Sequence, residues 1–176
     1  MKILRIISGK YKGRVLKGFD IDGTRPTMDR IKESLFAMIQ ADIKNTHCLD
    51  LYAGSGALGI EALSNGAQSC VFVDQNKIAL KALKENTRGI TGVTIVESSS
   101  FQIHQKINQT FDLVFLDPPY HEHLIEKTLH YLLEHQLLSK EAIIICEYEE
   151  EKFSCEPFEI IKERQYGKKN IKILKK

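Results

Sequence analysis

The feature that most constrains this chain is the segment Leu49–Leu63, which reads Leu-Asp-Leu-Tyr-Ala-Gly-Ser-Gly-Ala-Leu-Gly-Ile-Glu-Ala-Leu. Its pattern predicts a buried strand, a tight turn and the start of a helix. Gly54, Gly56 and Gly59 have the G-x-G-x-x-G spacing, in which glycine lets the backbone turn sharply and approach a ligand closely. The free N–H groups at the start of such a helix favour polar or anionic ligands. The same spacing also arises from packing alone, so other residues must decide its meaning.

The rest of the chain alternates between strand-like and helical patterns, which predicts a mostly parallel, doubly wound α/β sheet. The apolar runs typical of strands cover 47–52, 69–74, 93–97, 111–116 and 141–147. The helical patterns between them cover 57–65, 76–88, 100–107 and 122–135. Two last runs, 158–166 and 170–175, predict an antiparallel hairpin at the end of the sheet. In such a sheet, ligands bind beyond the carboxyl ends of the strands.

The first residues predict a small basic β-hairpin ahead of the sheet. Short apolar runs at 3–8 and 14–16 flank a turn with lysines and one aromatic residue, Tyr11. Lysines can contact phosphates and a ring can stack on a base, so the loop suits a nucleic acid; a hairpin that only covers the sheet is the alternative. A helical pattern follows from Met28 to about Gln40, with Thr27 as its expected N-cap. We expect one domain, with 1–23 as the hairpin extension and 24–176 as the core.

Composition narrows the class of protein. The chain has 176 residues, of which 43% are hydrophobic and 27% charged, as in soluble globular proteins. Apolar runs of membrane-spanning length, a secretory signal and metal-type cysteine spacing are all missing from the sequence, so we expect a cytoplasmic protein without metal or membrane contacts. The net charge of +2 conceals basic ends, because six basic residues precede the first acidic one, Asp20, and five lysines lie within 168–176. Blocks of one sign suggest a polyanionic partner, although solvated tails would look the same.

Asp74 ends the apolar run 71–73, where a carboxylate can accept hydrogen bonds from the two hydroxyls of a ribose. Any nucleoside cofactor would satisfy this, NAD included. A lone aspartate at a strand end also serves as a turn former or helix cap. Asp74 by itself therefore leaves both interpretations open.

A more specific signal is Asp117-Pro118-Pro119-Tyr120, which directly follows the apolar run 111–116. The prolines fix the loop and remove two backbone donors. What remains suits a planar base with an exocyclic amine: Asp117 and the Pro118 carbonyl accept its two hydrogens while Tyr120 stacks on the ring. Accepting these hydrogen bonds frees the nitrogen lone pair for attack, so the protein contributes mainly position and electrostatics. A proline-rich turn after an edge strand is the structural alternative.

The segments Leu49–Gly56 and Asp117–Tyr120 together resemble those of S-adenosylmethionine-dependent amino-methyltransferases. Two further segments, 5–14 and 24–36, narrow the resemblance to the bacterial family that methylates the exocyclic N2 amine of a guanine in 16S ribosomal RNA. The likeness covers nearly the whole chain. It implies a Rossmann-like class I methyltransferase fold, S-adenosyl-L-methionine as cofactor, and small-subunit ribosomal RNA or a partly assembled 30S particle as partner.

The resemblance also implies roles for individual residues, with Asp74 at the ribose and Ser98–Phe101 at the adenine. The residues implied for the cofactor are Asp50, Tyr52, Gly54, Ser55, Gly56, Asp74, Gln75, Ser98, Ser99, Phe101, Arg25 and Thr27. Those implied for the target guanine are Asp117, Pro118, Pro119 and Tyr120. Those implied for RNA phosphates are Arg5, Lys10, Lys12, Arg14 and Arg30. One departure concerns the adenine, where serines at 98–100 replace the acidic or amide residue of many methyltransferases and would bind its amine more weakly.

Three other functions are compatible with parts of the sequence. Methylation of adenine N6 or cytosine N4 in DNA or RNA uses the same Asp-Pro-Pro-Tyr loop, although no additional recognition domain is visible. An NAD-dependent oxidoreductase would explain the glycine turn and Asp74, but it would need a second domain that the chain is too short to hold. A non-catalytic RNA-binding protein would not need both motifs intact. We also expect a monomer, since no long apolar interface stripe is visible in the sequence.

Overall fold

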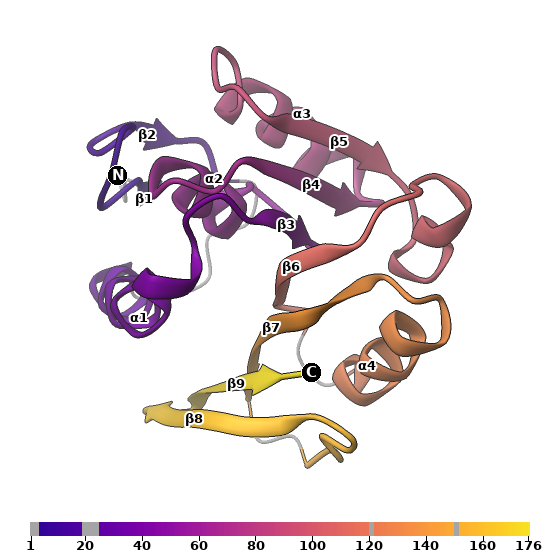
Figure 1. The fold of residues 1–176 in the computed structure, drawn as a ribbon. Coiled ribbons are helices and arrows are strands. Elements are labelled where there is room, and N and C mark those ends of the chain that lie inside the picture. Colours follow the sequence, from indigo (N-terminus) through magenta and orange to yellow (C-terminus); the bar gives the residue numbers. More distant parts are fainter. Residues whose placement is uncertain (1–3, 19–24, 120–121, 150–151) are drawn as a thin grey trace.

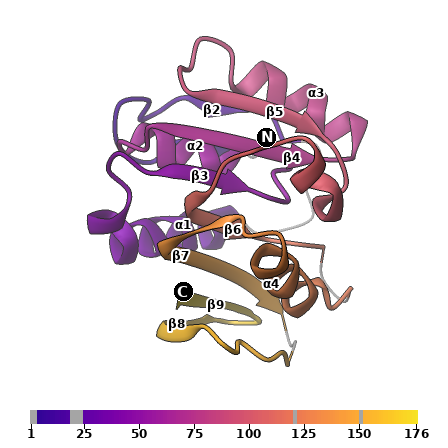
Figure 2. The same cartoon turned by 45° about the vertical axis from the view of Figure 1, so that its right-hand side comes forward.

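The computed structural model describes residues 4–18, 25–119, 122–149 and 152–176, and for 25–28 it describes the backbone alone (Figure 1). A twisted sheet runs through the middle of the molecule, with helices on both of its faces (Figures 1 and 2). A small two-stranded sheet, made of β1 (Leu4–Arg5) and β2 (Val15–Leu16), lies apart from it near the N-terminus.

The central sheet follows the alternation of apolar runs in the sequence. Within the described residues it has seven strands in the order β5-β4-β3-β6-β7-β9-β8. The parallel strands are β3 (His47–Asp50), β4 (Ser69–Asp74), β5 (Val93–Glu97), β6 (Phe111–Leu116) and β7 (Leu138–Glu149). The last two strands, β8 (Glu159–Tyr166) and β9 (Lys169–Lys175), form an antiparallel hairpin whose β9 also pairs with β7. The carboxyl ends of β3, β4 and β6 therefore lie side by side.

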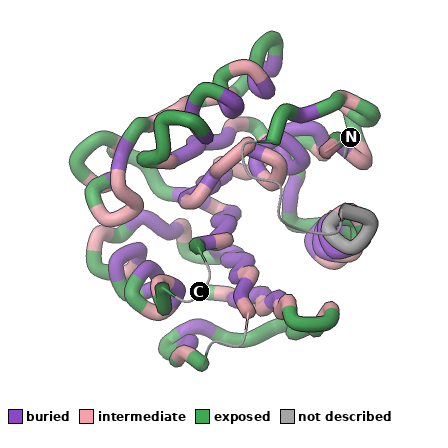
Figure 3. Tube along the Cα trace, turned by 180° about the vertical axis from the view of Figure 1, so that it is seen from behind, coloured by how far each residue is buried: buried purple, intermediate pink, exposed green. Residues whose placement is uncertain are grey.

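The helices form one layer on each face of the sheet. One face is covered by α1 (Arg25–Ile39), α2 (Ala57–Ser64) and α3 (Lys77–Asn86), and the other by the 3₁₀ segment η2 (Ser100–Gln105) and α4 (Leu124–Glu134). Successive strand residues alternate between the two faces, so Cys48 packs in the first core and Leu49 in the second. Figure 3 shows the buried residues following the strands, and burial of this apolar surface is the main force that holds the layers together.

The β1–β2 hairpin is fixed to α2 by buried polar contacts. The carboxylate of Glu61, fully buried in α2, accepts hydrogen bonds from the backbone N–H groups of Ile7 and Ser8 at 2.9–3.2 Å. Lys32 of α1 completes this arrangement, because its ammonium lies 3.1 Å from Glu61 and donates to the carbonyl of Arg5. Removing either partner of such a buried ion pair leaves the other charge without compensation and costs several kcal/mol. The hairpin is thus a fixed part of the molecule.

The structure confirms the predicted fold class, including the mostly parallel sheet, the C-terminal hairpin and the small N-terminal hairpin. Two local predictions were wrong. Helix α1 begins at Arg25, so Thr27 lies inside the first turn and is not the N-cap; proline at position 26 fits that turn because its missing N–H is not needed there. Strand β7 begins at Leu138, before the predicted run 141–147, because Leu138 already pairs with Phe111 ahead of a shift in register that brings Leu113 opposite Ile143.

Candidate active site

The turn after β3 is shaped by glycines that serve different purposes. Gly56 is the N-cap of α2 and has a φ of 84°, a left-handed conformation that favours glycine. Gly59 is needed for packing, because a Cβ there would lie 2.3 Å from the ring of Phe72. Gly59 therefore fits the packing interpretation of this motif, Gly56 makes the sharp turn, and the approach of a ligand to the turn stays a prediction. The turn brings the N-terminus of α2 to the carboxyl edge of the sheet.

Asp50, predicted for the methionine end of the cofactor, lies beneath this turn. It is 2% exposed, and one of its carboxylate oxygens accepts a hydrogen bond of 3.0 Å from the Gly59 N–H. Burial raises the pKa of Asp50 to about 7, with the charge of Asp74 adding to the effect and the Gly59 hydrogen bond opposing it. The geometry therefore gives Asp50 an observed contact with α2, and a role at the cofactor stays a prediction.

Asp74 sits at the end of β4 and organises the edge around it. One carboxylate oxygen accepts from the Gly54 N–H at 2.8 Å, and the other accepts from the Asn76 N–H at 2.8 Å. Asn76 in turn caps α3 by accepting from Ile78 and Ala79. Because each carboxylate oxygen has two lone pairs, the half-buried Asp74 can still accept from ribose hydroxyls. The carboxylate thus joins the glycine turn to the start of the next helix.

The segment predicted for the adenine lies next to Asp74. The N–H of the buried Ser98 donates to the Asp74 carbonyl at 3.0 Å, and Ser99 caps η2 through the Phe101 N–H. Gln75, which follows Asp74, is exposed. These residues line one edge with the glycine turn. Their arrangement fits the ribose and adenine of a nucleoside cofactor, because a carboxylate, hydroxyls and backbone groups converge there.

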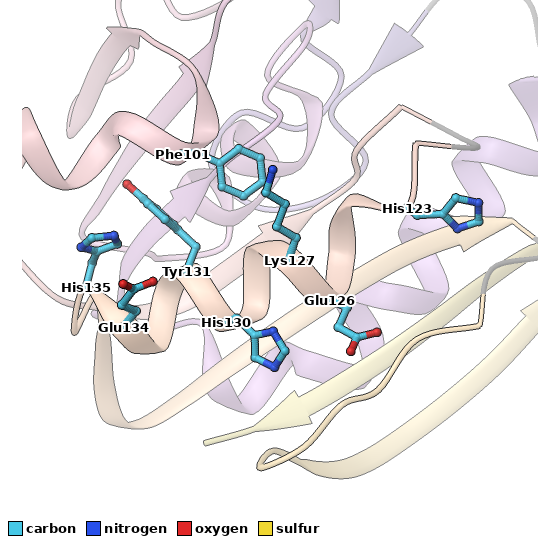
Figure 4. Close-up of a pocket in the computed structure, with 8 residues that line it drawn as sticks. All are labelled: Phe101, His123, Glu126, Lys127, His130, Tyr131, Glu134 and His135. Carbon is cyan, nitrogen blue, oxygen red and sulfur yellow. The ribbon is translucent and has the colours of Figure 1, made fainter.

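Two more predicted cofactor residues are held by α4. The hydroxyl of Tyr52 is 2.7 Å from that of Thr128, and the ring of Phe101 makes an edge-to-face contact with Tyr131 at a centroid separation of 5.5 Å. Lys127 places its ammonium 4.5 Å from the Phe101 ring centre. Phe101, Lys127 and Tyr131 border a groove of about 590 Å³ along α4 (Figure 4). The groove is separate from the glycine turn, none of whose residues lines it.

Asp117 follows β6, with Pro118 buried behind it and Pro119 exposed. Tyr120 lies outside the described residues, so its stacking role stays a prediction. Asp117 is half-buried, and its pKa is raised well above the usual range. The causes are burial first and then the negative charge of Glu147, while the positive charge of Lys169 opposes them. The carboxyl group therefore keeps its proton to a higher pH than an exposed aspartate does.

Glu147 and Lys169 are functional candidates that the sequence analysis missed. Their side chains form a salt bridge of 2.7 Å and are only 12% and 22% exposed. Glu147 lies on β7 one position beyond Cys146, which pairs with Leu116, and so it stands beside Asp117. The lysine comes from β9, 52 residues away from Asp117 in the chain. The charge at the end of the apolar run 141–147 was the only local signal, and the sequence did not reveal its partner.

The predicted RNA contacts of the hairpin lie away from Asp117. Lys10 donates its backbone N–H to the carbonyl of Ser64, the last residue of α2. The glycine turn lies at the opposite end of this helix, before its first residue. The eight residues of α2 span about 12 Å, so the hairpin tip with Lys10 and Lys12 is separated from the turn by that length. Arg14 donates to the Arg88 carbonyl beyond α3.

The remaining predicted residues are on α1 or concern other ligands. Arg30 is exposed on α1, while the side chains of Arg25 and Thr27 lie outside the described residues. In the described part of the chain, no group of three or more His, Cys, Asp or Glu side chains could hold a metal ion. No helix among the same residues is long and apolar enough to cross a membrane.

Comparison with known proteins places this geometry in context. A family model described as Conserved hypothetical protein 95 matches residues 4–175. The chain is 38% identical over 172 residues to ribosomal RNA small subunit methyltransferase D of Haemophilus influenzae, which covers 93% of this chain and 89% of that protein. It is 36% identical over 150 residues to the Escherichia coli protein of the same name, which covers 84% and 76% respectively. The solved structure of the Escherichia coli methyltransferase yhhF superposes with a TM-score of 0.88 at 29% identity, over 99% of this chain and 98% of that one.

Proposed function

The chain belongs to the family described as Conserved hypothetical protein 95, and from this premise we propose that it methylates the N2 amine of a guanine in small-subunit ribosomal RNA. Its cofactor is S-adenosyl-L-methionine. The observation that carries the proposal is the position of Asp117. It ends a buried strand whose neighbour β3 leads into the glycine turn, so the carboxylate that would hold the base lies next to the corner that would hold the cofactor.

The cofactor residues fit this role by their chemistry. Asp74 offers carboxylate lone pairs for the ribose, Ser98 and Ser99 stand beside it, and the Gly54–Gly56 turn leaves room for close approach. When bound, S-adenosylmethionine supplies a methyl group attached to a positively charged sulfur. An amine nitrogen can attack this methyl group, and the sulfur then leaves as part of S-adenosylhomocysteine. The protein holds these two reactants together and so removes much of the entropic cost of their meeting.

Asp117 would act by accepting hydrogen bonds from the guanine amine. An ionised carboxylate accepts such bonds more strongly than a neutral one, and together with the Pro118 carbonyl it would make the nitrogen lone pair available. Lys169 favours the ionised form and Glu147 disfavours it. A general base is not required, because the methylated ammonium is acidic enough to give its proton to water.

We further propose that the enzyme acts in the cytoplasm as a monomer, on small-subunit ribosomal RNA or on a partly assembled 30S particle. The names of the relatives from Haemophilus influenzae and Escherichia coli support ribosomal RNA of the small subunit as the substrate. Recognition of one guanine by a protein this small would depend on the shape of the surrounding RNA, since RNA is read through exposed loops and bulges.

The test uses purified protein, tritiated S-adenosylmethionine and small ribosomal subunits that lack the modification, followed by digestion of the RNA to nucleosides. We expect the label in N2-methylguanosine. Label in methyladenosine or methylcytidine would contradict the guanine assignment while keeping the chemistry of the Asp117 loop. Absence of transfer to subunits, naked RNA and DNA, despite binding of S-adenosylhomocysteine, would contradict catalysis itself.

A further inference from the structure

Helix α3 carries a stripe of basic residues on its outer face, which continues into the turn that follows it. Lys77, Lys81, Lys84 and Arg88 are all exposed. Their spacing of four, three and four residues places them on one side of a helix, while Leu80 and Leu83 pack into the core on the other. In the part of the chain that the structure describes, no ion pair involves any of the three lysines. We call these four residues the α3 basic stripe.

One end of the stripe lies where Arg14 and Lys17, the residues on either side of β2, contact the end of α3 and the turn after it. Arg14 donates from Nη2 to the backbone carbonyl of Arg88 at 2.5 Å, and Lys17 forms an ion pair with Glu85. The buried Asn86 accepts from the Lys17 N–H at 2.8 Å and donates to the Lys17 carbonyl at 2.9 Å. Asn86 also donates to the carbonyl of Ser55 at 2.8 Å, which links the hairpin to the glycine turn.

A cavity of about 460 Å³ lies at this junction, between the hairpin and α3. Arg14, Lys17 and Arg88 contribute its cationic groups, and Val15 contributes an apolar surface that is 61% exposed. Glu85 is the acidic residue in the lining, and its pKa is lowered, chiefly by its hydrogen bond and charge attraction to Lys17 and further by Lys81 and Arg88. This direction fits a surface on which positive charge prevails.

The other end of the stripe lies at the proposed cofactor corner. Lys77 is the first residue of α3, directly after Asn76, whose backbone N–H donates to Asp74. From Lys77 to Arg88 the stripe extends about 16 Å at the rise of a helix. It therefore forms a cationic path from the edge of the active site to the hairpin residues Arg14 and Lys17.

We propose that the α3 basic stripe and the hairpin cavity bind the phosphate backbone of ribosomal RNA outside the target nucleotide. This inference rests on the proposed function and adds the path that the RNA takes across the protein. Lysine ammoniums act as point charges toward phosphates and carry no base recognition, so the stripe contributes affinity and register, while the Asp117 loop selects the base. Because Asn86 and the Glu61–Lys32 pair fix the hairpin to the core, the path and the active site keep one geometry.

The test compares two triple variants with the same loss of charge. In the stripe variant, Lys77, Lys81 and Lys84 are replaced by Gln; in the control, Lys44, Lys140 and Lys176, exposed lysines near the amino ends of the strands, are replaced by Gln. Binding of unmodified 16S ribosomal RNA is measured at several salt concentrations. Each lost phosphate contact reduces the slope of log K against log[salt] by about 1, so we expect the stripe variant to lose about two to three units of slope.

The expected result is weaker RNA binding and a higher KM for RNA in the stripe variant alone, with S-adenosylhomocysteine binding and circular dichroism unchanged in both. Arg88→Gln, which keeps the backbone acceptor for Arg14, should show a smaller change in the same direction. Equal affinities and slopes for the two triple variants would overturn the proposal. If the stripe variant lost affinity for assembled subunits but not for naked RNA, the stripe would contact a ribosomal protein and not RNA, and the proposal would be overturned as well. Failure of the wild type to transfer methyl groups would contradict the proposed function. The comparison of RNA binding would still show whether the α3 basic stripe contacts RNA.

Discussion

Two aspartates lie at the carboxyl ends of strands of the same sheet, and the structure holds them by different means. Asp74 is fixed by backbone N–H groups from its own neighbourhood, those of Gly54 and Asn76, both at 2.8 Å. Asp117 is surrounded by charged side chains from the far end of the chain, Glu147 on β7 and Lys169 on β9. The first arrangement gives a rigid acceptor for a neutral diol. The second gives a carboxylate whose charge depends on its neighbours.

The difference matches the two tasks that we assign to these residues. A ribose needs fixed acceptors in a constant position, which backbone donors provide at little entropic cost. A reacting amine benefits from an acceptor whose charge is tuned, and burial together with nearby charges is how proteins tune a carboxyl group.

The largest effect is expected for Asp117→Ala. Removal of the acceptor should lower the rate of methyl transfer about 100- to 1,000-fold, as loss of one preorganised polar contact does at other active sites. Binding of RNA and of S-adenosylhomocysteine should change little, as measured by filter binding and calorimetry. Glu122→Ala, a change at an exposed carboxylate just beyond the same loop, serves as a control for general disturbance. An unchanged transfer rate in Asp117→Ala would contradict the role of this residue.

A smaller effect, confined to the cofactor, is expected for Asp74→Asn. The amide keeps one acceptor oxygen and loses the charge, so hydrogen bonds worth about 1.5–3 kcal/mol to a charged group weaken. The Kd for S-adenosylmethionine should rise roughly 10-fold or more by calorimetry, while the Kd for RNA stays the same. Asp42→Asn, the same change at an exposed aspartate outside the proposed site, should have a much smaller effect. A cofactor affinity equal to that of the wild type would remove Asp74 from the site.

The smallest effect on activity is expected for Asp50→Asn, whose consequence is for stability. Because burial raises the pKa of Asp50 to about 7, the folded state binds a proton that the unfolded state releases from about pH 4 upward. The contribution of this group to the free energy of unfolding therefore falls as the pH rises from about 4 to 7, by up to about 4 kcal/mol. The variant should lose this pH dependence in urea unfolding and still accept the Gly59 hydrogen bond. Identical pH curves for variant and wild type would show that Asp50 stays ionised in the fold.

Features set by residues close together in the chain could be predicted from the sequence, and features that depend on distant residues could not. The strands, the glycine turn, Asp74 and the Asp117 loop are set by residues near one another in the chain, and the fold class and family were predicted from them. The Glu147–Lys169 pair depends on which strands become neighbours, and the contacts of Asn86 with Lys17 and Ser55 depend on how the hairpin docks. Neither follows from local patterns. The hairpin tip lies beside Ser64 and not beside Asp117. This position depends on the close packing of Gly9, where a Cβ would lie 1.9 Å from the Ser64 carbonyl oxygen.

The Asp117 carboxylate is proposed to accept hydrogen bonds from the amine of the target guanine, while Glu147 and Lys169 shift its ionisation in opposite directions. The most direct test is the pH dependence of single-turnover methyl transfer at saturating RNA and cofactor in the wild type, Glu147→Gln and Lys169→Met. The rate should rise with pH as Asp117 ionises. Loss of the negative neighbour lowers the pKa of Asp117 and should shift the profile to lower pH, whereas loss of the positive neighbour should shift it to higher pH. Shifts in the same direction, or two profiles identical to that of the wild type, would contradict the claim.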